Sequence, residues 1–136
     1  MVDNLDSRQR SAHMARIRAK DTGPELAVRK ITHSLGYRYR LHAAGLPGKP
    51  DLVFPGRGAI IFVHGCFWHR HPGCSLARLP KTRLDFWGPK LSANRVRDQR
   101  NERALRALGW RVMVVWECQV ANTERLAARI RRFLDA

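Results

Sequence analysis

Two short apolar runs lie at the centre of the chain, within the stretch PDLVFPGRGAIIFVHGCFWH that covers residues 50–69. Residues 51–54 and 59–63 are rich in aromatic and β-branched side chains, which favour strands. The Pro-Gly-Arg-Gly sequence between them is typical of a turn. The stretch therefore predicts two neighbouring strands, followed by a loop rich in Cys, His and aromatic residues over 64–80.

The residues before this stretch predict two helices and a further strand. A thin apolar stripe among many Arg and Lys predicts a short basic helix over residues 7–19. Residues 22–25 have the pattern of a capping box, and the helix that follows should end at Gly36. Residues 37–41 alternate between apolar and basic side chains, as a half-exposed strand does.

The residues after it predict a helix, a strand and a last helix. The helix covers 86–108 and stops at Gly109, and the strand over 110–116 is apolar enough to be covered on both faces. Thr123 should cap the last helix, which runs through Leu134. This order of elements predicts the α/β class, with a small mixed sheet flanked by helices.

Length and charge limit the organisation and the partners of the chain. With 136 residues, 44% of them hydrophobic, the chain suits one core, so we expect residues 1–20 to form a basic arm and 21–136 a single domain. The net charge of +15 predicts a polyanionic partner, nucleic acid first. A membrane surface fits less well, because the basic residues are scattered along the sequence.

The N-terminus and the cysteine content predict a cytoplasmic protein. The first six residues are polar and acidic, unlike a signal peptide, and no apolar run is long enough to span a bilayer. In the cytoplasm three cysteines favour metal binding or free thiols over a disulfide framework.

A Cys/His pattern predicts a structural zinc site. Cys66, His71 and Cys74 lie within nine residues, and Cys118 follows the last strand, which together supply the four N/S ligands of a Zn²⁺ tetrahedron. His64 and His69 are competing ligands at this stage. The alternative is that the cysteines are buried free thiols.

Asp51 and two histidines are candidates for phosphodiester chemistry. A carboxylate at the start of a strand can hold a divalent metal against a phosphate, although Asp51 could equally be a turn residue. His64 and His69 could act as general base and electrophile. Asp98 could orient one of them, or be a surface charge, and Glu25 has an ordinary role in the capping box.

Adjacent aromatic residues suggest contact with bases. Phe67-Trp68 and Phe86-Trp87 each place two large rings side by side in a basic protein, where such rings can act as wedges between base pairs. The alternative assigns Phe86 and Trp110 to the core and Trp68 to a cover over the zinc.

Several of these motifs, in this order, resemble the very-short-patch repair (Vsr) family of mismatch-specific DNA endonucleases. The resemblance covers about residues 7–134 and rests on the blocks LPGKPD (46–51), HGCFWH (64–69), TR with FW (82–83 and 86–87), RD (97–98), and GWRV through WEC (109–118). It implies a restriction-endonuclease-like fold related to the PD-(D/E)xK nucleases. In the general PD-(D/E)xK pattern an acid and a lysine would stand where this chain has Phe62-Val63-His64.

The family resemblance implies an activity and a set of catalytic residues. The activity is Mg²⁺-dependent nicking 5′ to the thymine of a T:G mismatch, the lesion left when 5-methylcytosine deaminates. Asp51 and the backbone carbonyl of Val63 would bind Mg²⁺, and His69 would activate water. His64, Glu25 and Asp98 would complete the site.

The same resemblance implies the remaining ligands and partners. Cys66, His71, Cys74 and Cys118 would hold zinc, and the basic arm would contact double-stranded DNA. The residues expected to intercalate or to contact the mismatch are Met14, Phe67, Trp68, Trp87, Lys90 and Asn94. The protein would act as a monomer, with functional links to a 5-methylcytosine methyltransferase and to mismatch-repair proteins.

Two other functions remain open from the sequence. The chain could be a restriction-like nuclease that cuts matched DNA. It could also be a zinc-stabilised DNA-binding module without catalysis, whose affinity comes from its charge and its aromatic wedges.

Overall fold

Four strands form one mixed sheet in the computed structural model, which describes residues 22–41, 43–78 and 84–136. In spatial order the strands are β1 (Arg40–Leu41), β2 (Leu52–Phe54), β3 (Ala59–His64) and β4 (Arg111–Trp116). The first three pair antiparallel, whereas β4 lies parallel to β3.

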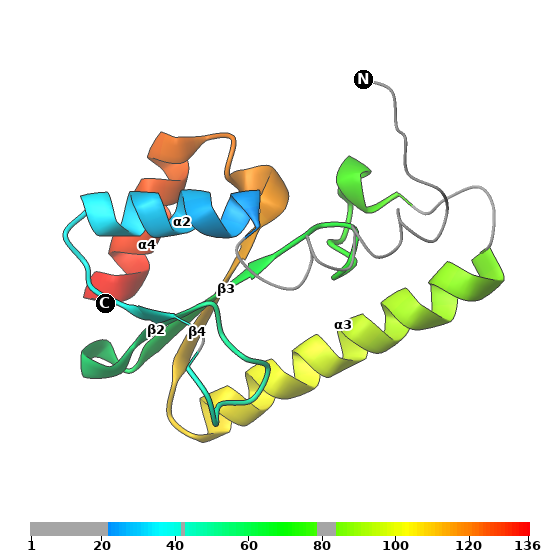
Figure 1. The fold of residues 1–136 in the computed structure, drawn as a ribbon, viewed down its shortest axis with the longest axis horizontal. Coiled ribbons are helices and arrows are strands. Elements are labelled where there is room, and N and C mark those ends of the chain that lie inside the picture. The colour runs from blue at the N-terminus through cyan, green and yellow to red at the C-terminus, as the bar shows by residue number, and fades with distance from the viewer. Residues whose placement is uncertain (1–21, 42, 79–83) are drawn as a thin grey trace.

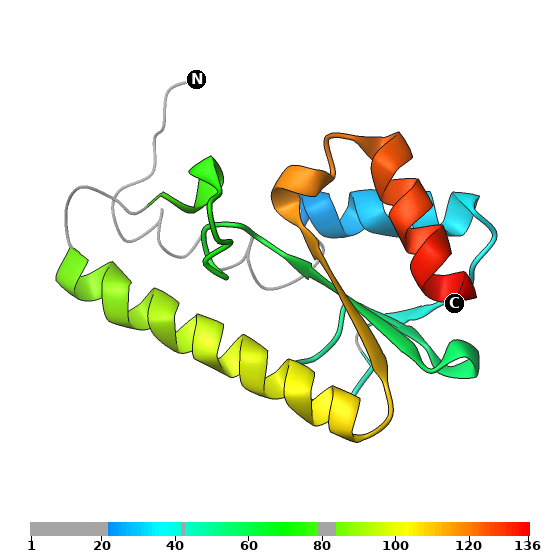
Figure 2. The ribbon, with the colours of Figure 1, turned by 180° about the vertical axis from the view of Figure 1, so that it is seen from behind.

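Helices cover both faces of the sheet. They are α2 (Gly23–Ser34), α3 (Leu84–Ala107) and α4 (Thr123–Asp135), with short 3₁₀ turns η1 (Pro55–Arg57), η2 (Ser75–Ala77) and η3 (Glu117–Gln119). Helices α2 and α4 lie together on one face and α3 on the other (Figure 1), and the reverse view in Figure 2 shows the same three layers. The long α3 connects β3 to β4, which allows these two strands to run parallel.

Strand β3 is the centre of the core because its side chains alternate between the two faces. Ala59, Ile61 and Val63 pack in the cluster that includes α2 and α4 residues. Ile60 and Phe62 pack with Leu105 of α3. All six residues of β3 are therefore buried.

The predicted bounds of α2 are confirmed by its caps. The Thr22 side chain accepts a hydrogen bond from the Glu25 backbone N–H at 3.4 Å. Gly36 has a φ of +94°, the left-handed conformation expected just beyond a helix C-terminus. The predicted cap of α4 is wrong by one residue, because the Asn122 side chain accepts from the Arg125 N–H at 3.1 Å.

The predicted mixed α/β sheet flanked by helices is confirmed, with two differences in the strands. Residues 37–41 form a strand only at Arg40–Leu41. In β4 only Met113 and Val115 are buried, because this edge strand is less covered on the side of α3. The basic arm expected over residues 1–20 lies outside the described residues. Among those described, no helix is both long enough and apolar enough to cross a membrane.

Candidate active site

Asp51 stands at the point where the chain enters β2. Its carboxylate oxygen accepts a hydrogen bond from the Val63 backbone N–H at 2.6 Å. This bond joins the start of β2 to β3. The turn before it needs glycine at position 48, where φ is +77° and an added Cβ would lie 3.0 Å from the Asn101 Cβ. This turn therefore packs directly against α3 and fixes the approach to Asp51.

A second carboxylate lies beside Asp51. Glu25 of α2 is buried, and its carboxylate forms an ion pair with Arg29 at 3.5 Å. Burial raises the pKa of Asp51 from its usual 3.8 to about 7, and the Glu25 charge adds to this, although the Val63 N–H and Arg29 lower it. Two neighbouring carboxylates, one of them costly to ionise, form an arrangement that a divalent cation would stabilise.

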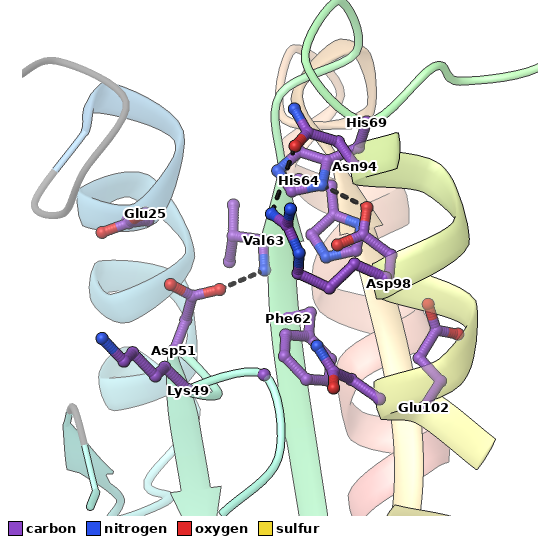
Figure 3. A pocket seen from close by; sticks show the side chains of 13 residues that line it. Glu25, Lys49, Asp51, Phe62, Val63, His64, His69, Asn94, Asp98 and Glu102 are labelled. Carbon is purple, nitrogen blue, oxygen red and sulfur yellow. Dashed lines mark hydrogen bonds and ion pairs between the residues drawn. The ribbon is translucent and has the colours of Figure 1, made fainter. Parts of the chain in front are cut away.

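His64 and His69 lie face to face, on the opposite side of β3 from Asp51 (Figure 3). Their ring centroids are 3.9 Å apart and the rings are nearly parallel, at 6°. His64 ends β3 and is buried, whereas His69 comes from the loop that follows. Burial, with a contribution from His69, lowers the pKa of His64 to about 3, so His64 is neutral near pH 7.

His69 is held by a carboxylate of α3. Its Nδ1 lies 2.5 Å from the Asp98 carboxylate oxygen. Since an ionised carboxylate only accepts hydrogen bonds, this contact puts the ring proton on Nδ1 and leaves Nε2 as the basic nitrogen. His64, His69 and Asp98 also have donor atoms within 4.8 Å of one another. These three side chains therefore also have the spacing of possible metal ligands.

These groups line one hollow of about 370 Å³ between β3, α2 and α3 (Figure 3). Asp51 and Glu25 stand on one side of β3, and His69 and Asp98 on the other. The hollow also includes residues that the sequence had not indicated as catalytic: Lys49, Arg97, Asn101 and Glu102. Residues three or four positions apart share one face of a helix. That spacing, counted along α3 from Asn94, could have identified Arg97, Asn101 and Glu102.

The three cysteines and one histidine meet in a separate cluster. The ligand atoms of Cys66, His71, Cys74 and Cys118 all lie within 4.8 Å of one another. His71 Nδ1 is 3.6 Å from the Cys66 sulfur and 3.5 Å from the Cys118 sulfur. The structure thus selects His71, rather than His64 or His69, as the histidine beside the cysteines.

This cluster has the dimensions of a tetrahedral zinc site. Zn–S bonds of about 2.3 Å and Zn–N bonds of about 2.0–2.1 Å separate N and S ligands of a tetrahedron by about 3.6 Å. The two observed N–S distances, 3.6 and 3.5 Å, match that separation. Burial raises the pKa of the Cys66 thiol to about 12, so its ionisation needs a positive charge beside it, which a bound metal would supply. The donor set therefore fits Zn²⁺.

The aromatic side chains form one cluster next to the hollow. Trp87 lies 5.6 Å from Phe67 and 5.7 Å from Trp68, measured between ring centroids. Phe86 is 45% exposed, which contradicts its assignment to the core. Trp110 is half-buried and packs on the smaller core cluster.

A second hollow, of about 420 Å³, connects two of these aromatics to groups of the first hollow. Phe67 and Trp68 line it together with Glu25, Val63 and His69, which also line the first hollow. Lys90 of α3 has its ammonium 5.8 Å from the Trp87 ring centroid. Met14, the remaining residue expected at the mismatch, lies outside the described residues.

A solved nuclease shares the fold. The catalytic domain of the homing endonuclease I-Bth0305I superposes with a TM-score of 0.56, covering 83% of this chain and 94% of that one, at 18% identity. This likeness is one of fold and agrees with the restriction-endonuclease-like class expected from the sequence.

Sequence relatives define the family. Residues 2–75 match the family described as DNA mismatch endonuclease Vsr. The type II nicking enzyme V.XorIIP of Xanthomonas oryzae is 56% identical over 99% of this chain and 98% of its own length. The DNA mismatch endonuclease Vsr of Escherichia coli is 41% identical over 93% of this chain and 80% of its own length. The chain belongs to the Vsr family and is an endonuclease that acts on DNA phosphodiester bonds.

Proposed function

We propose that this endonuclease nicks one strand of duplex DNA 5′ to the thymine of a T:G mismatch. The observation that supports this best is the shared wall of the two hollows. A carboxylate pair and a His–Asp pair line the first hollow, and two rings of the aromatic cluster, Phe67 and Trp68, line the second. Hydrolysis and base contact would then take place side by side.

In this proposal Asp51 and the backbone carbonyl of Val63 hold Mg²⁺, with Glu25 beside them. The pair formed by half-buried Asp51 and buried Glu25 fits a hard divalent cation, which prefers oxygen ligands. When bound, Mg²⁺ would offset the phosphate charge and lower the pKa of a coordinated water.

His69 is the proposed general base. Asp98 holds its Nδ1 proton, so Nε2 can take a proton from the attacking water, and the carboxylate then stabilises the imidazolium. The new P–O bond forms as the P–O3′ bond breaks, which leaves a 5′-phosphate and a 3′-hydroxyl. His64 stays neutral because it is buried and lies against His69, so it places no second cation 3.9 Å from the imidazolium that forms. A neutral His64 can donate one ring N–H to a phosphate oxygen.

The aromatic cluster is the proposed mismatch wedge. Phe67, Trp68 and Trp87 would insert beside the T:G pair, where weakened stacking lowers the cost of separating the bases. Lys90 and Asn94 would contact the mismatch, and Met14 and the basic arm the surrounding DNA. These assignments rest on the contacts among the three half-buried rings, on the position of Phe67 and Trp68 beside the first hollow, and on the net charge of +15.

Zn²⁺ is the proposed occupant of the cluster formed by Cys66, His71, Cys74 and Cys118. It would fix the loop that carries His69, because His69 lies between two of the cluster ligands, Cys66 and His71. His71 also stacks on Trp116 at 4.2 Å, and the edge of that indole meets His64 at 5.3 Å between ring centroids. Zinc would thus support the catalytic histidines without taking part in hydrolysis.

The biological setting completes the proposal. A cytoplasmic monomer would serve short-patch repair of deaminated 5-methylcytosine, in concert with a cytosine methyltransferase and mismatch-repair proteins. The domain division at residue 20 belongs to the same proposal, with the first 20 residues as a DNA-contacting arm.

The test is strand nicking of a labelled duplex with one T:G pair, beside a T:A duplex, in Mg²⁺ and in EDTA. We expect Mg²⁺-dependent cleavage of the T:G duplex alone. Asp51→Ala should slow it by about a thousand-fold or more, with mismatch binding kept, whereas the exposed Glu124→Ala should leave the rate unchanged. Equal cleavage of the T:A duplex would favour the restriction-like alternative. Binding without cleavage would favour the non-catalytic module.

A further inference from the structure

Hydrolysis of a phosphodiester adds negative charge to a group that is already an anion. Of the residues that the structure describes, four acids line the first hollow, Glu25, Asp51, Asp98 and Glu102, and the neutral His64 beside them does not offset their charge. A fixed cation close to the phosphate would stabilise the transition state strongly in such a site. The lysine and arginine side chains that line the hollow are Lys49 and Arg97.

Arg97 has the better position of the two. It precedes Asp98 on α3, so the same helical turn carries Arg97 and the carboxylate that holds His69. Both residues are exposed, but Lys49 lies across the hollow on the turn before β2, with a φ of +49°. Arg97 therefore lies on the same side of the hollow as His69, the proposed base. From there it would contact the phosphate on the side where water is activated.

The guanidinium of Arg97 is also oriented. Its Nη1 donates to the Asn94 side-chain oxygen at 3.3 Å. The Asn94 amide nitrogen in turn donates to the Trp68 backbone carbonyl at 3.3 Å. Arg97 is therefore linked through one side chain to the loop that carries both the proposed wedge and His69.

We propose that Arg97 is a catalytic residue that contacts the scissile phosphate and stabilises the negative charge of the transition state. The guanidinium is a planar fork with five N–H donors, of which the bond to Asn94 uses one, and such a fork matches two phosphate oxygens. In the PD-(D/E)xK pattern a lysine follows the second acid by two residues and supplies the cation. In this chain Arg97 of α3 would supply that cation instead. The inference rests on the proposed hydrolytic function of the same hollow.

The experiment compares Arg97→Ala and Arg97→Lys with Arg103→Ala, which removes the same charge from an exposed position of α3 outside the hollows. Single-turnover nicking is measured at saturating T:G duplex, and the dissociation constant of that duplex is measured with Ca²⁺ in place of Mg²⁺. We expect Arg97→Ala to lower the nicking rate by about 100-fold. Its affinity should fall no further than that of Arg103→Ala.

Two further measurements separate catalysis from folding and from general charge. Guanidinium ion added to Arg97→Ala should raise its nicking rate and leave the wild-type rate unchanged, and Arg97→Lys should recover part of the loss. A wild-type rate for Arg97→Ala at saturating DNA would overturn the proposal, whatever its affinity. If Arg97→Ala fails to fold, a folded Arg97→Gln that nicks at the wild-type rate would overturn it equally, because glutamine keeps most of the side chain and removes the charge.

The test of Arg97 does not depend on whether the substrate is a T:G mismatch. If the wild-type enzyme nicks a matched duplex instead of the T:G duplex, the proposed function fails, and the same variants are compared on that matched duplex. The role of Arg97 then still depends only on the ratio of nicking rates.

Discussion

The two ends of strand β3 are held by different kinds of interaction. At its first residue, Ala59, arginines bind the end of α4: Arg57 donates to the Leu134 carbonyl at 3.0 Å, and Arg111 donates to the Phe133 carbonyl. Each guanidinium also lies over an aromatic ring, Arg57 over Tyr37 at 4.8 Å. Cations at a helix C-terminus satisfy carbonyls that have no partner within the helix.

At the other end of β3 the groups oppose ionisation or repel one another. Asp51 lies beside Glu25, and its raised pKa measures the cost of its charge there. His64 is buried in its neutral form against a second imidazole. The interactions at the Ala59 end of β3 therefore stabilise the fold. At the His64 end, holding the ionisable groups in place lowers the stability of the fold.

Loss of zinc from the reactive end should give the largest change in stability. Cys118 is exposed, so Cys118→Ser would be nearly neutral if the thiols were free. As a zinc ligand its loss should remove bound zinc and lower the free energy of unfolding by about 3 kcal/mol or more. Zinc content by mass spectrometry and the melting temperature check this. Full zinc content with an unchanged melting temperature would refute the site.

Asp51→Asn should stabilise the protein in buffer without divalent cations. The folded-state pKa of Asp51 is raised from 3.8 to about 7, so between these values the native state binds more protons than the unfolded chain. The free energy of unfolding then falls as pH rises through this range and levels off above it. Asparagine cannot ionise, so Asp51→Asn should raise the free energy of unfolding at neutral pH by about 2 kcal/mol. This value is reduced to account for screening by water in the open hollow.

The difference between wild type and Asp51→Asn should therefore vanish near pH 4 and be full at pH 7.5, in urea unfolding curves. Added Mg²⁺ should stabilise the wild type and leave the variant unchanged, which reduces the difference. A difference of constant size at all pH values would show that ionisation of Asp51 is not its cause.

Arg57→Ala should give the smallest effect and act on stability alone. It removes a helix-end hydrogen bond, the contact with Tyr37 and a half-exposed ion pair with Asp135, together worth about 1 kcal/mol. Nicking at saturating DNA should be unchanged, and Arg103→Ala should leave the melting temperature nearly unaltered. A fall in nicking rate at full folding would show that the two ends of β3 are coupled.

The local elements followed from the sequence because their signals are local. Thr22 and Gly36 set the limits of α2 through hydrogen bonds and backbone conformation within a few residues. The cap of α4 was misplaced by one residue, because Asn122 and Thr123 can both cap a helix and only the geometry chooses between them. The short β1 depended on how far β2 extends beside it, which no local pattern contains.

The candidate site divides in the same way. Motifs indicated Asp51, His64, His69 and the cysteines, because these residues occur together in blocks that resemble the Vsr family, although each alone has an ordinary alternative role. Arg97 and Glu102 escaped notice, since charged residues on a basic helix are ordinarily solvated.

By itself the sequence determined the α/β class, the Vsr resemblance and the types of ligand available. Only the tertiary structure decided that His71 rather than His69 joins the cysteines, that His69 pairs with Asp98 across 29 positions, and that Arg97 faces the acids. The reason is physical: residue types fix which bonds a chain can make. Packing of α3 against the sheet fixes which of those groups come within reach of one another.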